Sequence, residues 1–223
     1  MPVSVVIPTL NEAASVGAAI DSAFAAGAAE VIVTDGGSSD ATLALAQAHG
    51  ARTIARERVR ARQLNAGAEA ATSNVLLFLH ADTTLPAGAC AAAEQALERG
   101  AHFGGFRLRF AEPQPTLRIA ETLINLRTRI TRCPWGDQAQ FIARDTFTRA
   151  GGYRADLPIM EDYELAVRMK RAGRNDVVPL YVTTSGRRFL EKGVLRTVAI
   201  NWRIVIAFRL GADPNELASI YRR

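Results

Sequence analysis

The stretch VSVVIPTLNE, residues 3–12, decides the expected fold of this chain. It opens with a short, almost continuous apolar run, which is typical of a parallel strand that is buried on both faces. Polar residues follow at once, and a helix is expected from Asn11 to about Ala26, where Gly27 ends it. A buried strand that leads directly into a helix predicts the first unit of an α/β fold.

The same alternation repeats three more times in the first hundred residues. Four strands that alternate with four helices predict a doubly wound and mostly parallel sheet with helices on both faces, which is a nucleotide-binding architecture. The later strands of this half are expected at 30–34, 51–55 and 75–79, and its later helices at about 40–49, 61–71 and 86–100.

The alternation loosens after residue 100. The pattern of 103–110 predicts a strand at an exposed edge of the sheet, and no linker, repeat or low-complexity tract divides the chain. One domain of residues 1–223 is therefore predicted, with a nucleotide-binding half up to residue 100. Further strands are expected at 138–143 and 176–182, and helices at 116–132, 160–172, 195–210 and 215–221.

Composition restricts the function only broadly. The 223 residues carry a net charge of +5 that comes almost wholly from arginine, a residue whose planar guanidinium suits phosphate groups and anionic surfaces. The two cysteines, Cys90 and Cys133, have no metal-type or redox-type spacing, so a reducing cytoplasmic setting is expected. No signal segment is recognised, and no apolar run approaches the ~20 residues that span a bilayer.

Polar clusters follow three of the expected strands. Pro8 to Glu12 follow the first, Asp35 to Asp40 the second, and His80 to Asp82 the fourth. In doubly wound sheets, ligands bind outside the carboxyl ends of the strands, so these clusters are expected to meet at one site. Helix capping would account for several of these residues, but it does not require an aspartate directly after an apolar strand, as Asp35 and Asp82 are.

Five separated motifs resemble those of family 2 glycosyltransferases of the GT-A fold. They are VSVVIPTLNE, VIVTDGGSSDAT, RARQLNAGAEAA, LFLHADT and MEDYELAVRMKRAG, in the family's order from residue 3 to residue 173. The stretches WGDQAQF and GADPNELASIY also resemble a small bacterial subgroup labelled arsenosugar-biosynthesis glycosyltransferase. This likeness implies transfer of a sugar from a nucleotide diphosphate donor, with residues 101–190 as the acceptor half and 191–223 as C-terminal helices.

The resemblance implies a donor site at the strand ends. Thr9 and Glu12 match residues that line the uridine and ribose pocket, and Asp35 matches the aspartate that accepts a hydrogen bond from the base, which favours uracil. Arg62 matches a guanidinium that stacks on the base or reaches a phosphate, although a solvated helix face would also explain it. The full donor site implied is Pro8, Thr9, Asn11, Glu12, Asp35, Gly36, Arg62, Asn65, His80, Ala81 and Asp82.

The resemblance also implies a divalent metal, Mg²⁺ or Mn²⁺, bound by Asp82. This residue matches the last aspartate of the family's DxD motif, and a hard cation there would stabilise the charge on the departing diphosphate. The first aspartate of the motif is replaced by His80, which is expected to bond the ribose or the metal. The late histidine ligand of many relatives has no counterpart among His49, His80 and His102.

Asp162 is the expected general base, with Glu161 as the alternative. An inverting transfer needs one carboxylate to take the acceptor's proton as the acceptor attacks the anomeric carbon. First-turn acids that complement a helix dipole would explain the same two residues. The expected sugar and acceptor pocket contains Gly105, Trp135, Gly136, Asp137 and Gln138, and a flexible loop at 185–189 is expected to bring Arg187 and Arg188 to the pyrophosphate.

The sequence therefore predicts an inverting, metal-dependent hexosyltransferase that prefers a UDP-sugar. Two alternatives stay open: a nucleotidyltransferase that makes activated sugars, and a nucleotide-sugar-binding protein without turnover. The expected partners are the donor and a small-molecule or lipid-linked acceptor, without nucleic acid, and a homodimer is left open. The amphipathic stretch Leu195 to Leu210 is expected to pack on the domain, with peripheral contact at the inner membrane face as the alternative.

Overall fold

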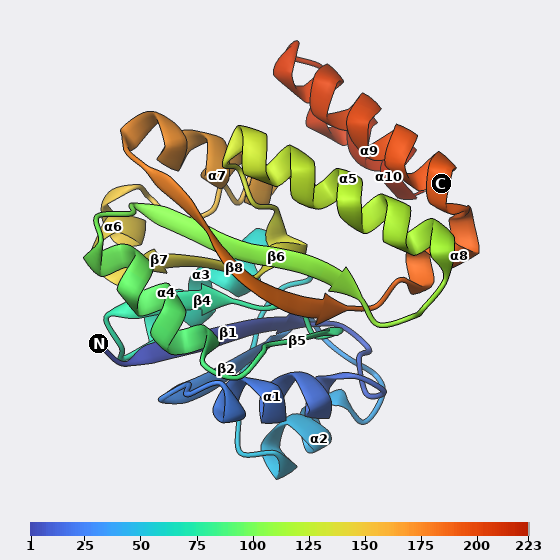
Figure 1. Cartoon of the computed structure of the whole chain (residues 1–223). Helices are drawn as coiled ribbons and strands as arrows, with labels where there is room; N and C mark the ends of the chain where they lie inside the picture. Colours follow the sequence, from blue (N-terminus) through green and yellow to red (C-terminus); the bar gives the residue numbers. More distant parts are fainter. Residues whose placement is uncertain (223) are drawn as a thin grey trace.

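The computed structural model describes residues 1–222 and has a mixed α/β fold (Figure 1). One eight-stranded sheet runs through it in the order β3-β2-β1-β4-β7-β6-β8-β5. The first four strands of this order are parallel, whereas β7 is antiparallel to both β4 and β6, and β5 is antiparallel to β8. The strands are β1 (Val3–Thr9), β2 (Glu30–Asp35), β3 (Arg52–Ala55), β4 (Val75–Phe78), β5 (Thr83–Thr84), β6 (Phe103–Phe110), β7 (Gln140–Ala143) and β8 (Asn175–Thr184).

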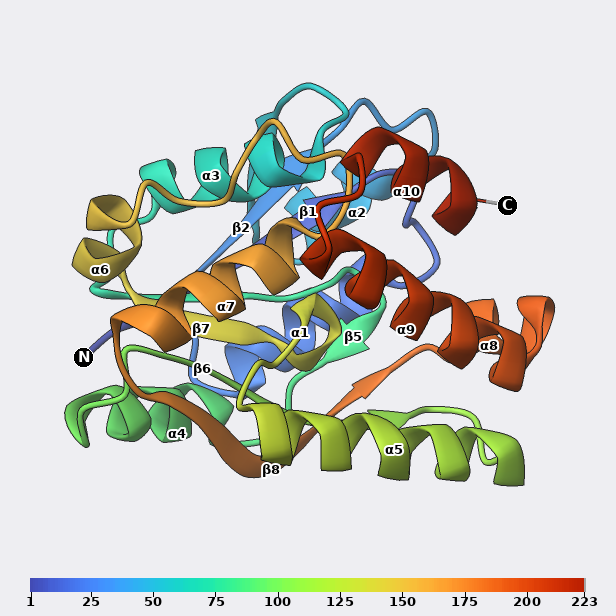
Figure 2. The ribbon, with the colours of Figure 1, turned by 90° about the horizontal axis from the view of Figure 1, so that it is seen from above.

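Helices cover both faces of the sheet, as the sequence predicts (Figures 1 and 2). The group α1, α2 and α4 lies on one face, α3, α6 and α7 lie on the other, and α5, α8 and α9 pack over the far end of β6. The helices are α1 (Val16–Ala25), α2 (Thr42–Ala48), α3 (Arg60–Ala70), α4 (Ala89–Glu98), α5 (Pro115–Thr131), α6 (Arg144–Arg149), α7 (Glu161–Ala172), α8 (Arg187–Lys192), α9 (Val194–Arg209) and α10 (Pro214–Arg222), with a 3₁₀ turn at Gly136–Gln138.

The alternation of side chains along β1 explains why helices can cover two faces. Val5 and Ile7 pack with α1 and α4, whereas Val6, between them, packs with α3 and α7. Successive side chains of a strand point to opposite faces, so a strand in the middle of such a sandwich must be apolar at nearly every position. This is the physical reason for the continuous apolar run at the start of the chain.

Strand β6 departs from the prediction of an exposed edge. It lies between β7 and β8 inside the sheet, and among its eight residues only Arg109 is exposed. The alternation over Phe106–Phe110 has another cause: Leu108 and Phe110 pack under α5 and α8, while Arg107 and Arg109 face outward and stack on Tyr181. A strand inside a sheet therefore shows the alternating pattern of an edge strand when helices cover only one of its two faces.

Two local expectations also change. Helix α1 begins at Val16 rather than Asn11, because Asn11 has a positive φ of 56° and its side chain and backbone bond the loop after β2. The expected flexible loop at 185–189 instead runs into α8, which begins at Arg187. The long segment at 195–210 forms α9, as predicted, and within the described residues no helix is long and apolar enough to cross a membrane.

Candidate active site

Two adjoining cavities lie at the carboxyl ends of β1, β2 and β4. The strand-end cavity, of about 460 Å³, is lined by Pro8, Thr9, Leu10, Glu12, Arg58, Val59, Arg60, Gln63, His80, Ala81, Asp82 and Pro158. The helix-side cavity, of about 450 Å³, is lined by Arg60, His80, Asp82, Phe110, Trp135, Asp137, residues 158–163, Thr184, Ser185, Arg188, Phe189, Asn201, Ile204, Val205 and Tyr221. Arg60, His80, Asp82 and Pro158 line both, so the cavities join at these residues.

The strand ends meet because β1 and β2 are parallel neighbours, which sets Thr9 beside Asp35. Asp35 is 1% exposed, and its carboxylate accepts hydrogen bonds from Thr9 Oγ1 at 3.0 Å, from the Gly37 and Ser38 amides at 2.8 Å each, and from Ser38 Oγ. Burial raises the pKa of Asp35, but these hydrogen bonds outweigh it and hold the pKa below its usual value. Asp35 thus shapes the loop after β2, and its contact with a base stays a prediction.

A second set of hydrogen bonds connects the loop after β2 to the start of the segment between β1 and α1. The Asn11 side-chain oxygen accepts from the Ser39 amide at 2.8 Å, and the Glu12 amide donates to Thr42 Oγ1 at 2.8 Å. The Glu12 carboxylate faces the strand-end cavity, and burial together with the nearby Asp82 raises its pKa although Ser15 donates to it. Of the positions predicted from the first motif, Pro8, Thr9 and Glu12 therefore line this cavity, whereas Asn11 does not.

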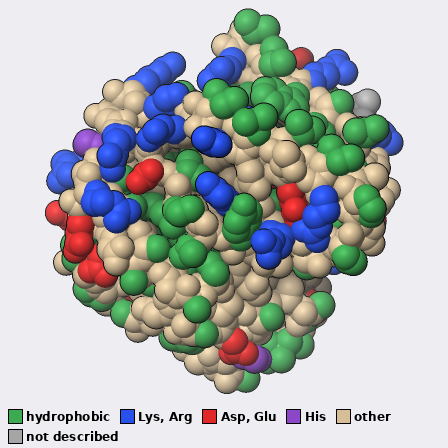
Figure 3. Space-filling model, in the orientation of Figure 1, with side chains coloured by type: hydrophobic (Ala, Val, Ile, Leu, Met, Phe, Trp, Pro, Cys, Tyr) green, Lys and Arg blue, Asp and Glu red, His purple; other side chains and the backbone are tan. Residues whose placement is uncertain are grey.

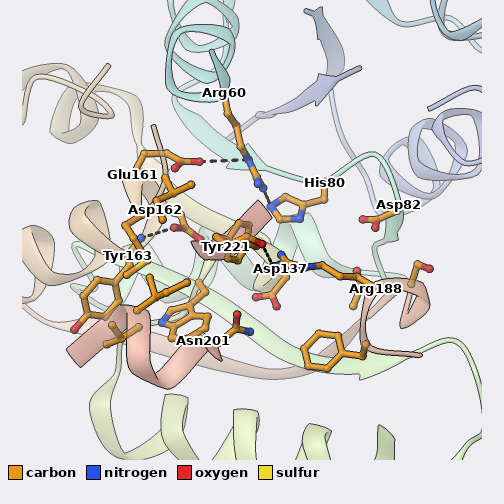
Figure 4. A pocket seen from close by; sticks show the side chains of 18 of the residues that line it. Arg60, His80, Asp82, Asp137, Glu161, Asp162, Tyr163, Arg188, Asn201 and Tyr221 are labelled. Atoms are coloured by element: carbon orange, nitrogen blue, oxygen red, sulfur yellow. Dashed lines mark hydrogen bonds and ion pairs between the residues drawn. The ribbon is translucent and has the colours of Figure 1, made fainter. Parts of the chain in front are cut away.

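Arg60, at the first turn of α3, joins the two cavities. Its Nε lies 3.4 Å from Glu161 Oε1, and its Nη2 contacts His80 Nε2 (Figure 4). Burial lowers the pKa of Arg60, but the Glu161 and Asp162 carboxylates raise it above its usual value, so the guanidinium stays charged. Burial and this guanidinium hold the pKa of His80 well below its usual value. His80 is therefore neutral, and its Nε2 lone pair accepts from Arg60.

Asp162 lies at the start of α7 and faces the helix-side cavity. Its Oδ2 accepts from the Gly136 amide at 2.6 Å and its Oδ1 from the Tyr163 amide at 2.7 Å. A Cβ at Gly136 would lie 2.8 Å from His80 Nε2 and 2.9 Å from Asp162 Oδ2, so this approach requires glycine. Met160, just before the helix, has φ of 70°, a strained conformation for a side-chain-bearing residue that sets the direction of the first turn.

The segment after α5 carries a partly buried acid and an aromatic ring. Asp137 has a pKa raised to about 6, because burial outweighs the Arg127 guanidinium and Asp162 adds to the effect. Its Oδ1 is buried without a hydrogen-bond partner. The same Arg127 stacks on Trp135 with 3.5 Å to the ring centroid, and its Nη2 donates a hydrogen bond to Gln138 Oε1 at 3.0 Å. Trp135 and Asp137 therefore line the helix-side cavity, and Arg127 supports them from the interior.

The outer wall comes from the C-terminal helices. Arg188 of α8 lines the helix-side cavity, stacks on Tyr221 with 3.5 Å to the ring centroid and donates to the Tyr221 carbonyl at 3.3 Å. Phe189 packs on Phe110 with 4.9 Å between ring centroids. Arg187 is exposed and lines neither cavity.

Several predicted residues lie away from both cavities. Arg62 is exposed and pairs with Glu57, because two residues along a helix turn it to nearly the opposite side from Arg60. Asn65 bonds the backbone of Tyr153 through both side-chain atoms, at 2.8 and 2.9 Å. Gly105 is buried under Pro134, where a Cβ would lie 2.6 Å from the proline Cβ.

Sequence reasoning missed two residues that organise the site. Arg60 is the first residue of the motif RARQLNAGAEAA, and its place directly before the helix expected at 61–71 is the only signal that the sequence gives for it. Gln63 Nε2 donates to the carbonyls of Thr9 at 2.9 Å and Thr34 at 2.7 Å, so it ties the ends of β1 and β2 together. A buried glutamine behind a strand end gives no signal in the sequence.

The residues fit a divalent metal only as one shared with a bound diphosphate. Within residues 1–222, no group of three or more His, Cys, Asp or Glu side chains is placed to hold a metal ion. Asp82 nevertheless faces both cavities, and its Oδ1 accepts a single long bond of 3.3 Å from Thr83 Oγ1. Mg²⁺ commonly binds through one or two carboxylates plus substrate phosphates and water, which this arrangement allows.

Solved structures show where this fold has been seen. A mannosyltransferase from Pyrobaculum calidifontis, solved with GDP-Man and Mn²⁺, matches with a TM-score of 0.68 and 18% identity over 99% of this chain and 68% of its own. Glucosyl-3-phosphoglycerate synthase from Mycobacterium tuberculosis, solved with Mn²⁺ and UDP-Glc, has a TM-score of 0.64 and 21% identity over 95% and 80%. TarS of S. aureus has a TM-score of 0.66 and 15% identity over 90% of this chain, which spans only 40% of TarS.

At these identities the structural likeness shows the fold, which is the GT-A fold that the sequence predicts. No curated protein sequence matches the chain significantly. The family assignment rests on a sequence model, that of glycosyl transferase family 2, which matches residues 4–155 and so more than half of the chain. The strand ends, His80 to Asp82, and the segment at 135–138 all fall within that match. The chain therefore belongs to glycosyl transferase family 2.

Proposed function

We propose that this chain is an inverting hexosyltransferase that moves a sugar from a UDP-sugar to an acceptor hydroxyl and depends on Mg²⁺ or Mn²⁺. The observation that carries the proposal is that Asp82 and Asp162, 80 positions apart in the sequence, line one cavity from two sides (Figure 4). A transferase needs charge stabilisation at the leaving group and a base at the acceptor, and this arrangement supports Asp82, through a bound metal, in the first role and Asp162 in the second. Residues 1–223 would act as one domain.

The nucleoside diphosphate would occupy the strand-end cavity. Asp82 would hold the metal together with the donor phosphates, and the metal would supply positive charge for the departing diphosphate. Arg60 stays charged beside Asp82 and would add to that stabilisation, while His80, neutral and bonded to Arg60, is left with one ring N–H to donate to the donor. Solved relatives of the fold carry both GDP-Man and UDP-Glc with Mn²⁺; the preference for uridine rests on the resemblance at Asp35.

The sugar and the acceptor would meet in the helix-side cavity. The acceptor oxygen attacks the anomeric carbon, the bond from that carbon to the phosphate oxygen breaks, and the electron pair leaves with UDP. The acceptor proton goes to Asp162, whose carboxylate is held by the Gly136 and Tyr163 amides and keeps further lone pairs for it. Trp135 offers a ring face for a sugar, and Arg188 adds positive charge at the outer wall.

The first test is donor binding. UDP at a hundredfold excess over its Kd should add about 2.7 kcal/mol to the free energy of unfolding, which is roughly 5–10 °C in Tm for a chain of this size. The shift should be larger with Mn²⁺ than without, and Asp82→Ala should remove the metal-dependent part.

Asp145→Ala is the matched control, because Asp145 is an exposed acid that lines neither cavity. Shifts with ADP or GDP as large as with UDP, and no metal effect, would overturn the donor site proposed here. Normal UDP binding without transfer to any acceptor would favour a binding protein, and release of pyrophosphate from UTP and a sugar phosphate would favour a nucleotidyltransferase. The acceptor, including the one that the arsenosugar subgroup would suggest, stays open to a screen.

A further inference from the structure

Helix α5 presents a row of large apolar side chains to solvent. Ile119, Leu123, Leu126 and Ile130 are all exposed, and Ile130 reaches 72%. They follow one another at intervals of four, three and four residues, so they form one stripe along the outer face of the helix. The inner face is a separate stripe, where Leu117 and Ala120 pack on Phe110 and Phe189. The outer stripe therefore is not part of the core of this domain.

Helix α9 carries a second such stripe beside the first. Leu195, Trp202, Ile206 and Leu210 are exposed, with Trp202 at 45% and Leu210, just past the helix end, at 83%. Leu123 of α5 and Trp202 of α9 line the same small cavity between the two helices, so the stripes meet there. Both helices lie at the top of the molecule in Figures 1 and 3, where hydrophobic side chains gather with Lys and Arg beside them. We name these eight residues the apolar ridge.

The charges on the two helices of the apolar ridge are mostly positive. Arg196, Arg203 and Arg209 are exposed on α9, a helix without any acidic residue. Helix α5 has one acid, Glu121, which is already held by Arg118 and by the Phe110 amide. An ordinary solvated helix face carries charges of both signs, whereas α9 carries only positive ones.

An open groove of arginines borders the ridge on its other side. Arg107, Arg109, Arg129 and Arg132 line it together with Leu126, which belongs to the ridge. The two acids in its wall are engaged elsewhere: Glu121 as described above, and Asp176 by Arg174 at 3.8 Å and by the Val177 amide at 3.0 Å. The groove therefore keeps a net positive charge, with donors suited to phosphate.

We propose that the apolar ridge and its flanking arginines dock this protein onto the surface of an anionic lipid bilayer. Leu, Ile and Trp side chains would enter the headgroup boundary, where tryptophan is favoured, while the arginines would reach lipid phosphates. A second copy of the chain is a poorer occupant, because two such helix pairs would bring arginine against arginine, and the one acid on these helices, Glu121, is already held by Arg118. Charge complementarity thus selects an anionic membrane.

Docking in this way also bears on the acceptor, a point that rests on the proposed transferase function. The face of α9 opposite the ridge, with Asn201, Ile204 and Val205, lines the helix-side cavity. A docked molecule would hold that cavity about one helix diameter, ~10 Å, from the headgroups. The acceptor hydroxyl would then belong to a membrane lipid rather than to a freely diffusing metabolite.

The test is co-sedimentation of the whole protein with vesicles, without any donor present. Wild type should bind vesicles of phosphatidylcholine mixed with phosphatidylglycerol, bind phosphatidylcholine alone far less, and be released by salt. Arg196→Gln with Arg203→Gln should weaken binding about 30-fold, because each arginine near an anionic surface contributes roughly a factor of five. Trp202→Ser with Ile206→Ser should weaken it on the order of tenfold even in low salt.

Arg56→Gln with Arg99→Gln is the matched control, because it removes the same charge from exposed positions away from both helices. The proposal is overturned if wild type ignores anionic vesicles, or if the control pair loses as much binding as the α9 pair. Dimers that dissociate in the Trp202→Ser, Ile206→Ser variant, without vesicle binding by wild type, would make a second copy the occupant. Loss of transfer into vesicles of bacterial lipid extract, with UDP stabilisation unchanged in that variant, would support the lipid acceptor; unchanged transfer would refute it.

Discussion

Replacing Asp162 with asparagine tests the chemistry and the packing of the site together. Both oxygens of the carboxylate accept backbone amides, from Gly136 at 2.6 Å and from Tyr163 at 2.7 Å. Asparagine has one oxygen and one NH₂ group, so one of these two amides would face a donor. Leaving a buried donor unpaired costs about 1–3 kcal/mol. Since 1 kcal/mol shifts Tm by roughly 2–4 °C in a chain of this size, Tm should fall by about 2–12 °C.

The effect on transfer should be larger than the effect on folding. An asparagine cannot take the acceptor's proton, and a positioned general base contributes a factor of ~10²–10⁴ to the rate. Donor binding should change little, because the strand-end cavity is lined by residues other than Asp162. The variant should therefore bind UDP and Mn²⁺ as wild type does, and lose transfer.

The assay is UDP release in the presence of an acceptor, with Tm and UDP-induced stabilisation measured on the same preparation. Asp145→Asn is the matched control, because Asp145 is also a first-turn acid, at the start of α6, and is exposed. Transfer within a factor of ten of wild type would refute Asp162 as the base. If Glu161→Gln abolished transfer instead, the base would move by one residue, to a carboxylate whose pKa is already raised by burial.

Two further predictions follow from the residues around Asp162. Gly136→Ala should push His80 and Asp162 apart, since the new Cβ would lie under 3 Å from an atom of each; transfer should fall on the order of 10²-fold with circular dichroism unchanged, and undiminished transfer would contradict the close approach. Asp137 has a folded-state pKa of about 6 against an ordinary 3.8, so its contribution to stability is full below 3.8 and is lost as pH rises through 6. The Asp137→Asn variant has no carboxyl to ionise, so it does not lose stability in this way. Its free energy of unfolding minus that of wild type should therefore rise by on the order of 3 kcal/mol from pH 4 to pH 7. A difference between the two proteins that does not change with pH would refute the raised pKa of this acid.

Local patterns in the sequence were sufficient for every strand except β5, for most of the helices and for the strand ends as the place of a cavity. A strand that is buried on both faces must be apolar at nearly every position, so the run from Val3 to Ile7 can be recognised as a strand without knowledge of its neighbours in the sheet. Polar residues directly after such strands, as at Glu12 and Asp82, mark the edge where parallel strands end together. Both residues line the strand-end cavity, and their roles there stay predictions.

The neighbours that a residue acquires across the sheet depend on pairing between distant segments, and no local pattern encodes them. β6 reads like an edge strand, yet the antiparallel β7 on one side and β8 on the other place it inside the sheet. Arg60 and Arg62 are the same residue type in the same motif, so the sequence does not distinguish them. Only the direction in which α3 leaves the sheet decides that Arg60 lines both cavities and Arg62 lines neither.

The environment of each side chain follows the same division. The sequence by itself determined that Asp137 stands between a tryptophan and a strand, but its raised pKa comes from burial beside Arg127 and Asp162, which the folded chain brings together. It also determined that α9 is amphipathic, whereas the placement of α5 alongside it turned two separate stripes into one exposed ridge. Periodicity reports which face of an element is apolar, and only tertiary packing decides whether that face is covered.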